Sequence, residues 1–156
     1  MRVGIGEDLH RVDDGRTLVL GGVIIEEGPG LSGHSDADVL FHAITDAVLG
    51  AAALGDIGHY FPPSDPRYAH ADSADFLRKA LELARDDGWE VVNIDSTVRA
   101  ERPKLAPYIQ HIRERIAQVV GIASETVSVK AKSGEGLDAV GRGEAMSAIA
   151  VVLLER

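Results

Sequence analysis

The sequence predicts an α+β fold, a single-domain sandwich in which α-helices cover one face of a mixed β-sheet. Stretches with the pattern of strands and stretches with helical apolar spacing follow one another in mixed order along the chain. The chain has 156 residues, 45% of them hydrophobic, which suits one compact core, whereas two domains would each be marginal. We therefore expect residues 1–156 to form a single domain.

The first 50 residues are expected to form a strand, a hairpin and a helix. Residues 2–10 have the pattern of a strand. Residues 17–25 are typical of a hairpin, because their central Gly-Gly pair can adopt the positive φ values of a tight turn between two apolar runs. Helical spacing follows, and it predicts Ser35 as the N-cap of a helix and Gly50 as its C-terminal stop.

The rest of the chain is expected to add two helices and three strands. One helix begins with Ser73 as its N-cap and ends at Gly88, and Pro107 opens another that Gly121 closes. A Gly-rich connection, SGEGLDAVGRGE, joins the last two strands. The predicted strands are 89–100, 126–132 and 145–154.

Composition excludes several classes of partner. With 16 Lys and Arg against 25 Asp and Glu, the net charge of -9 disfavours nucleic acid and anionic membranes. The chain has no cysteine, so a transition metal would be held by histidine and carboxylate. We find no signal-peptide pattern and no apolar run of membrane-spanning length, and we expect a cytoplasmic protein.

Three residues form a candidate metal site. Asp8 and His10 stand two apart on the first strand, so their side chains share one face, although a solvated strand end would show the same pair. His42 lies between Phe41 and Ala43 in an apolar helical stretch, where it is either a core histidine satisfied by a carboxylate or a ligand. Together they would form a two-histidine, one-carboxylate set with an open coordination position for a substrate oxygen.

Two segments before the middle of the chain could bind a phosphorylated, hydroxylated substrate. His34 precedes the expected N-cap, where free backbone NH groups attract phosphate, or else lies in a solvent-exposed loop. Asp56 and Asp65 belong to a loop rich in Gly, Pro and Asp, and they could bind hydroxyl groups or make local turn bonds.

Two later segments could also meet phosphate. Lys104 follows a proline between a strand and a helix, where a plain surface lysine is the alternative. Ser133, Glu135 and Arg142 stand among glycines whose backbone NH groups can approach phosphate oxygens closely. A flexible linker is the alternative there, and the segment lacks the lysine-serine pattern of a P-loop.

The assembled motifs resemble one known family from residue 1 to about 155. GEDLH, HSDADVLFHAITDAVLGAAALGDIGHYFP, the DP at 65–66, RPKL and GRGE are similar to motifs of the 2-C-methyl-D-erythritol 2,4-cyclodiphosphate synthase family of the non-mevalonate isoprenoid pathway. This resemblance implies a metal-dependent phosphorus-oxygen lyase that converts 4-diphosphocytidyl-2-C-methyl-D-erythritol 2-phosphate to the 2,4-cyclodiphosphate and releases CMP. Because the substrate's own 2-phosphate attacks the β-phosphorus, no protein nucleophile is required.

The resemblance also implies a role for each matching residue. Asp8, His10 and His42 would hold one zinc ion per active site, and Glu135 would approach a second divalent cation, Mg²⁺ or Mn²⁺. The catalytic residues that would stabilise the pentacoordinate transition state are His34 and Ser133. The implied substrate-binding residues are Ser35, Asp56, Ile57, Gly58, Phe61, Pro62, Pro63, Ser64, Asp65, Ala100, Glu101, Arg102, Pro103, Lys104, Leu105, Ala106, Lys132, Gly134 and Arg142.

The family's assembly implies a homotrimer with active sites between subunits, where one subunit gives the zinc and its neighbour the nucleotide pocket. The chain departs from the family pattern at two places. Residues 132–135 read Lys-Ser-Gly-Glu in place of Thr-Thr-Thr-Glu, which keeps a hydroxyl but loosens the loop. Residues 138–139 read Asp-Ala in place of Gly-Phe, which removes a hydrophobic contact. The resemblance therefore does not carry over the family's substrate contact at residue 139 or an apolar ligand site near the trimer axis.

Two rival functions use the same residues. A zinc or two-metal phosphoesterase would use the Asp-His-His set to activate water. A nucleotide-binding trimer would use zinc only for structure, but structural zinc usually has four protein ligands and three good candidates are present.

Overall fold

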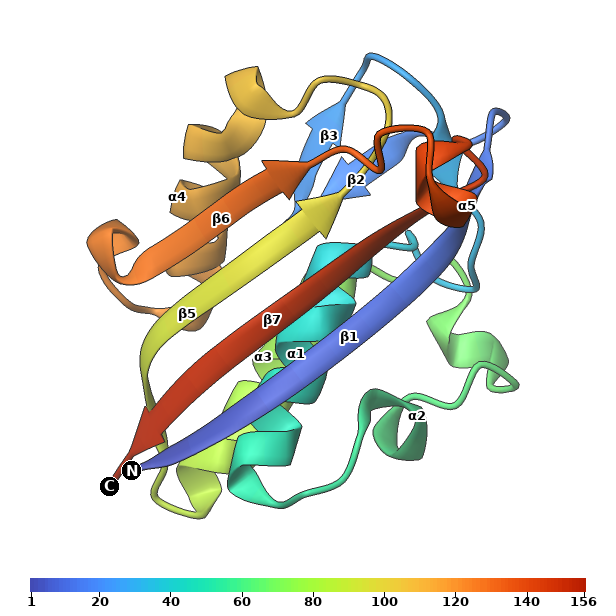
Figure 1. Ribbon diagram of the computed structural model, residues 1–156. Coiled ribbons are helices and arrows are strands. Elements are labelled where there is room, and N and C mark those ends of the chain that lie inside the picture. Colours follow the sequence, from blue (N-terminus) through green and yellow to red (C-terminus); the bar gives the residue numbers. More distant parts are fainter.

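In the computed structural model, which describes residues 1–156, helices cover one face of a five-stranded mixed sheet (Figure 1). The predicted α+β fold is thereby confirmed. The elements are β1 (Arg2–Asp13), β2 (Leu18–Leu20), β3 (Val23–Ile25), β4 (Gly30–Leu31), α1 (Val39–Ala52), α2 (Ile57–Tyr60), η1 (Pro66–Tyr68), α3 (Ser73–Asp86), β5 (Glu90–Arg99), η2 (Ala106–Tyr108), α4 (Ile109–Val120), η3 (Ser124–Thr126), β6 (Val127–Lys132), α5 (Asp138–Gly141) and β7 (Ala145–Glu155).

The strand order in the sheet is β4-β1-β7-β5-β6, and β2 pairs with β3 in a separate hairpin. Strands β5 and β6 are parallel, and the other pairs are antiparallel. The first and last strands of the chain are neighbours, with Arg2 opposite Leu154. The guanidinium groups of Arg2 and Arg156 lie 4.6 and 4.2 Å from the ring centroid of Trp89, so the two ends of the chain contact the same indole.

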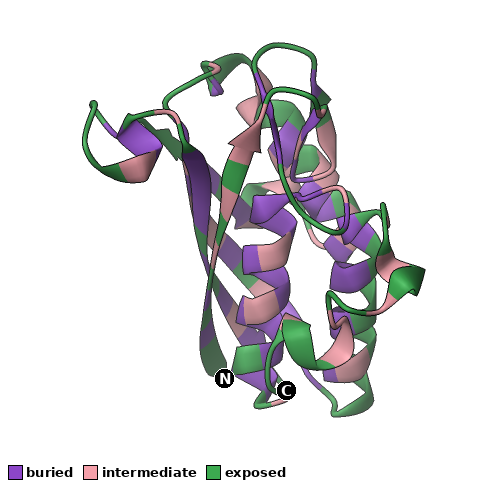
Figure 2. Ribbon diagram, turned by 90° about the vertical axis from the view of Figure 1, so that its right-hand side faces the viewer, coloured by how far each residue is buried: buried purple, intermediate pink, exposed green.

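Helix α1 packs directly against β1 because two glycines leave room for it. A Cβ added at Gly4 would lie 2.0 Å from the carbonyl oxygen of Ala47, and one at Gly6 would lie 2.0 Å from that of Ala43. Figure 2 shows α1 lying along the sheet, on the side that the other long helices share. Side chains two apart on a strand share a face, so the face that presents these glycines to α1 also presents Asp8.

The opposite face of the sheet carries exposed apolar side chains. Val3 and Ile5 of β1 are 69% and 70% exposed, and Ile149 and Val151 of β7 are also exposed. Their alternation with buried neighbours is the period of a strand with one face in the core.

None of the helices is long and apolar enough to span a membrane.

Most predicted elements are confirmed, but the start of α1 is later than expected. Asp38, not Ser35, is its N-cap, and the Asp38 carboxylate accepts hydrogen bonds from the backbone NH groups of Leu40 and Phe41. Ala37 has a φ of +58°, which interrupts helical geometry just before Asp38. His34 therefore does not lie at the helix N-terminus; it is exposed in the loop before α1, which is the other alternative that the sequence left open.

Two further boundaries differ from the prediction. Helix α1 continues through Gly50 to Ala52 and ends with Ala53 in the left-handed region at a φ of +61°. Helix α3 has Asp72 as its N-cap, with its carboxylate accepting from the backbone NH of Ala74, so Ser73 is the first helical residue. The hydroxyl of Ser73 is consequently available for another partner.

Candidate metal centre and adjoining cavity

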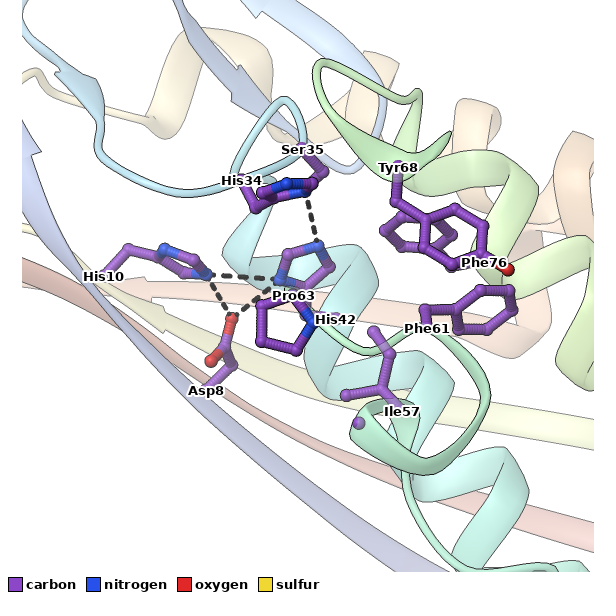
Figure 3. A pocket seen from close by; sticks show the side chains of 11 residues that line it. Asp8, His10, His34, Ser35, His42, Ile57, Phe61, Pro63, Tyr68 and Phe76 are labelled. Atoms are coloured by element: carbon purple, nitrogen blue, oxygen red, sulfur yellow. Dashed lines mark hydrogen bonds and ion pairs between the residues drawn. The ribbon is translucent and has the colours of Figure 1, made fainter. Parts of the chain in front are cut away.

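The side chains of Asp8, His10 and His42 converge on one point between β1 and α1 (Figure 3). The Asp8 Oδ2 atom lies 2.8 Å from His10 Nε2 and 3.0 Å from His42 Nδ1, and the two nitrogens are 3.2 Å apart. Two imidazoles and a carboxylate that present one atom each to a common point are the donor set that a zinc ion accepts in an open site. The donors therefore fit a metal ion.

Electrostatics favour the ionised carboxylate at this point. Burial alone would raise the pKa of Asp8, but hydrogen bonds and charge from His10 and His42 outweigh it and hold the pKa well below its usual value. Burial opposes the charge on His10, but its hydrogen bond with Asp8 raises the His10 pKa above the ordinary value. Without a metal, the charged His10 and the carboxylate thus stabilise each other.

Each histidine also makes a hydrogen bond through the ring nitrogen that points away from the common point of the three side chains. The backbone carbonyl of Ser32 accepts a hydrogen bond from His10 Nδ1 at 2.6 Å. Since a carbonyl only accepts, Nδ1 keeps its proton, so that in the neutral form of His10 the lone pair is on Nε2, the atom that faces Asp8. Nε2 of His42 lies 2.9 Å from Ser73 Oγ and 3.2 Å from Ser35 Oγ.

A cavity of about 290 Å³ extends from these three residues (Figure 3). It brings six sequence-predicted residues together with the metal-site candidates and adds two aromatic side chains from later in the chain. Its lining consists of Asp8, His10, His34, Ser35, His42, Ile57, Gly58, Phe61, Pro63, Tyr68 and Phe76. One end is polar and the other is apolar, so the cavity suits a ligand with a charged group and a small carbon skeleton.

The aromatic end of the cavity was only partly predictable. The rings of Phe61 and Phe76 stack with centroids 4.5 Å apart, and Tyr68 meets Phe76 edge to face at 5.6 Å. Of these three residues, only Phe61 was predicted from the sequence. A phenylalanine on an amphipathic helix such as α3 ordinarily belongs to the core, so no sequence signal marked Phe76 as a lining residue.

The predicted loop carboxylates make local bonds in this structure. Asp56 caps α2 by accepting from the backbone NH of His59 at 2.9 Å. Asp65 caps η1 and forms an ion pair with Arg67 at 2.6 Å. Pro62 and Ser64 lie in the same loop outside the cavity lining.

A second cavity of about 280 Å³ gathers most of the predicted nucleotide-side residues. They come from the segments after β5 and at the end of β6, and they are Ala100, Glu101, Pro103, Lys104, Leu105, Ala106, Lys132 and Ser133. Ala131, which was not predicted, completes the lining. Arg102, Gly134, Glu135 and Arg142 lie outside this lining. His34 and Ser133 thus line separate cavities of the same chain.

Residues 138–144, part of the segment that departs from the family pattern, do not form a flexible linker, because hydrogen bonds and ion pairs hold them. The Asp138 carboxylate accepts from the backbone NH groups of Val140 and Gly141, which starts α5, and it also pairs with Arg99 at 2.8 Å. Arg142 pairs with Glu144 at 2.9 Å. Asp138 therefore orders the segment through polar contacts.

The fold and the site together define a class: a mixed α+β protein with a candidate carboxylate-dihistidine metal centre at one end of a small-molecule cavity. The model of the YgbB family matches residues 1–155, nearly the whole chain. The chain belongs to the YgbB family.

Known relatives agree with this assignment. A Moorella thermoacetica protein named 2-C-methyl-D-erythritol 2,4-cyclodiphosphate synthase is 58% identical over 154 residues, which cover 99% of this chain and 94% of that protein. A solved structure of a synthase of the same name, in its CDP-bound form, has a TM-score of 0.91 and 37% identity, and covers 99% of this chain and 100% of that chain. The bifunctional IspDF of Campylobacter jejuni has a TM-score of 0.94 and 40% identity; the match covers 98% of this chain but 42% of that longer one.

Proposed function

We propose that this protein is a 2-C-methyl-D-erythritol 2,4-cyclodiphosphate synthase of non-mevalonate isoprenoid biosynthesis, with residues 1–156 as its single catalytic domain. It converts 4-diphosphocytidyl-2-C-methyl-D-erythritol 2-phosphate to the 2,4-cyclodiphosphate and CMP, which makes it a phosphorus-oxygen lyase. The observation that carries the proposal is the convergence of Asp8, His10 and His42 at the polar end of a cavity, in a chain that matches named synthases over nearly its full length.

Zinc is the metal we propose for the three converging side chains, because two imidazoles and one carboxylate suit it and leave a position open. When bound there, zinc would polarise a β-phosphate oxygen of the substrate as a Lewis acid. We further propose that Glu135 approaches a second divalent cation, Mg²⁺ or Mn²⁺, since hard cations favour carboxylate oxygens.

The chain's own residues position the substrate so that its 2-phosphate and β-phosphorus meet. His34 and Ser35 line the cavity beside the metal-site candidates, where they can donate hydrogen bonds to phosphate. Ile57 and Phe61 line the apolar end, which fits the methylerythritol carbon chain and excludes water from it. Because attack is intramolecular, this positioning supplies much of the rate enhancement.

The nucleotide side of the substrate belongs in the second cavity. Lys104 and Lys132 line it and would offset the negative charge of a diphosphate. Ser133, also in this lining, would act with His34 on the transition state. Because one chain holds these two residues in separate cavities, a shared role needs them from neighbouring subunits.

A homotrimer with active sites between subunits is therefore part of the proposal. The exposed apolar face of β1 and β7 supports it, since contiguous apolar surface of this kind marks an interface. A net charge of -9 supports a small-molecule substrate rather than nucleic acid or a membrane surface, and a cysteine-free composition supports a cytoplasmic location.

The test is a product assay. Purified protein with the CDP-linked 2-phosphate, zinc and magnesium should yield equal amounts of CMP and the cyclic diphosphate, separated by ion-exchange chromatography and identified by ³¹P NMR. Linear hydrolysed phosphates as the only products would instead support the phosphoesterase alternative and contradict the cyclase.

Replacing the third ligand candidate separates a catalytic metal from a structural one. His42→Ala should abolish zinc binding and turnover while the circular dichroism spectrum and the assembly mass stay as in the wild type. His111→Ala, at an exposed position of α4, is the matched control and should keep full activity. Loss of the fold in His42→Ala alone would favour a structural role for zinc.

A further inference from the structure

Arg16 has no role in the function proposed above, yet its side chain holds the segment that carries His34 and Ser35. Its Nη1 atom donates to the backbone carbonyl of Gly33 at 2.6 Å, and its Nη2 atom donates to that of Ser35 at 2.5 Å. His34 and Ser35 line the cavity at the candidate metal centre, whereas Arg16 does not (Figure 3). One guanidinium therefore bonds the backbone on either side of His34 from outside the cavity.

The guanidinium of Arg16 is not shared with a carboxylate. None of the ion pairs in the structure includes it, so its two terminal nitrogens are committed to the two carbonyls. Hydrogen bonds from a charged donor are stronger than those from a neutral one. Because the guanidinium is a rigid planar fork, it also fixes the separation of its two acceptors.

The backbone of Arg16 is itself anchored, in the turn between β1 and β2. The Asp13 carboxylate accepts from the backbone NH of Gly15 at 2.9 Å, and the Asp13 carbonyl accepts from that of Arg16 at 3.2 Å. An added Cβ at Gly30 would lie 2.3 Å from the Arg16 carbonyl oxygen, so β4 packs directly against this backbone. The guanidinium thus extends from an ordered part of the fold.

A second segment, just before α3, bonds the same backbone. The His34 carbonyl accepts from the backbone NH of His70 at 2.8 Å, and the backbone NH of Asp36 donates to the Ala71 carbonyl at 3.0 Å. The carbonyls of residues 33, 34 and 35 therefore all have partners, and two of the three bonds come from one side chain.

We propose that Arg16 is a positioning residue for the phosphoryl transfer, because it fixes the backbone on both sides of His34 and so orients the side chains of His34 and Ser35 toward phosphate. The action of these two residues on phosphate rests on the proposed function. The hold of Arg16 on the segment is a property of the substrate-free chain. A small displacement of a positioned group is costly in a reaction that depends on alignment.

The first test uses the substrate-free wild type and needs no substitution. The two protons on each Nη atom of Arg16 should give separate NMR signals, because the hydrogen bonds to the carbonyls stop the rotation that averages them. Averaged signals would overturn the proposal, whatever the activity of the protein.

The second test measures amide hydrogen exchange in Arg16 variants, also without substrate. Arg16→Ala should speed exchange at Asp36 and His70, whose NH groups bond across the held segment, by at least about tenfold. Arg16→Lys should show a smaller increase, since an ammonium is a point charge without the fork. Unchanged exchange at both amides in Arg16→Ala, or wild-type exchange and turnover in Arg16→Lys, would overturn the proposal.

The third test separates kcat from KM in the cyclase assay. Arg16→Ala should lower kcat about 10- to 100-fold. Its KM should stay within about threefold, because the nucleotide belongs in the second cavity, which Arg16 does not line. A wild type that forms no cyclic diphosphate contradicts the proposed function, whereas full kcat in Arg16→Ala of an active protein overturns the role of Arg16 alone.

Arg113→Ala is the matched control, since this guanidinium also donates to two backbone carbonyls. Its acceptors are Val127 at 2.8 Å and Ser124 at 3.1 Å, and it lines neither cavity. Arg113→Ala should lower the melting temperature, as Arg16→Ala does, but keep kcat and both amide exchange rates within about twofold of the wild type. Equal losses of kcat in the two variants would indicate general destabilisation and overturn the proposal.

Discussion

The charge on His10 should make the stability of the metal-free protein depend on pH. Hydrogen bonding to Asp8 raises the His10 pKa despite burial, so this contribution is fully present below the ordinary value of 6.5 and is lost as pH rises through the raised pKa. Asp8 has the opposite sign: its lowered pKa gives stability above the ordinary value of 3.8 that is lost as pH falls.

Comparison of the wild type with Asp8→Asn separates this pH dependence from the titration of all other groups. In chelator, the wild type should exceed the variant in melting temperature most between the two ordinary pKa values, 3.8 and 6.5, and the difference should shrink toward alkaline pH. A difference that grows with rising pH would contradict the pairing. Zinc should reverse the trend, because it competes with protons for the imidazoles.

At the scale of elements, the contact between α1 and β1 depends on atoms that are missing from glycine. Gly6→Ala would place a Cβ 2.0 Å from the Ala43 carbonyl oxygen and push the helix that carries His42 away from Asp8. We expect a loss of about 1–3 kcal/mol in the free energy of unfolding. Chemical denaturation measures this loss, and chelator competition should show weaker zinc binding.

The same helix offers the control. Gly50 is exposed within α1, and an added Cβ would meet nothing closer than 3.9 Å. Gly50→Ala should therefore stabilise the protein by about 0.5–1 kcal/mol, because alanine loses less conformational entropy in a helix. Equal effects of the two glycine substitutions would show that helix propensity, not close packing, governs this contact.

Asp38 joins α1 to the hairpin of β2 and β3. One of its oxygens accepts from Gly21, Leu40 and Phe41, and the other from Gly22 at 2.7 Å. Full burial raises the Asp38 pKa to about 6 against the pull of these backbone NH donors, so the carboxylate is ionised at slightly alkaline pH.

Asp38→Asn should cost about 1–3 kcal/mol, because one amide group would face a backbone NH donor and leave it unsatisfied. Hydrogen exchange would localise the effect, with faster exchange at Gly21 and Gly22 than in β7. Uniformly faster exchange through the whole sheet would contradict a role in joining the hairpin to the helix.

Periodicity predicted the existence of the main helices and strands, because the apolar stripe of each is a local property. The helix starts were not predictable in the same way. Ser35 and Ser73 are good N-cap residues by type, but Asp38 and Asp72 accept the backbone bonds, and Ala37 takes a left-handed conformation that spacing does not reveal. The two serines lie instead beside His42, through contacts between segments far apart in the sequence.

The same distinction between local sequence pattern and contacts of distant segments applies to the candidate site. Asp8 and His10 could be paired from strand alternation, and His42 from its odd place in an apolar stretch. Asp36 and Ser73 could not be linked to His42, since they depend on how the loop before α1 meets the start of α3. Short-range pattern thus predicts the ligand candidates, and three-dimensional packing determines what holds them.

At the scale of the whole molecule, the exposed apolar sheet face should control assembly. Ile5 lies opposite Val151 in the sheet, and both are exposed on that face. Ile5→Asp should convert the proposed trimer into monomers by analytical ultracentrifugation and reduce turnover with it, because the interface would have to bury a charge.

Ile24→Asp makes the same change at a residue that is 63% exposed on the separate β2-β3 hairpin. It should leave the mass of the assembly unchanged. A monomeric wild type, or a trimer that survives Ile5→Asp, would contradict the use of this sheet face as the interface.

Because β1 pairs with β7, the two ends of the chain lie next to each other. Both ends lie beside Trp89, and Asp8 is six residue steps along β1 from Arg2, a distance of about 20 Å. A short linker could join the ends, and new ends could be opened in the exposed turn 87–88 without cutting any strand or helix that carries a ligand candidate. The fold could therefore be circularly permuted. A fusion partner attached at the two adjacent ends would lie far from the candidate metal site.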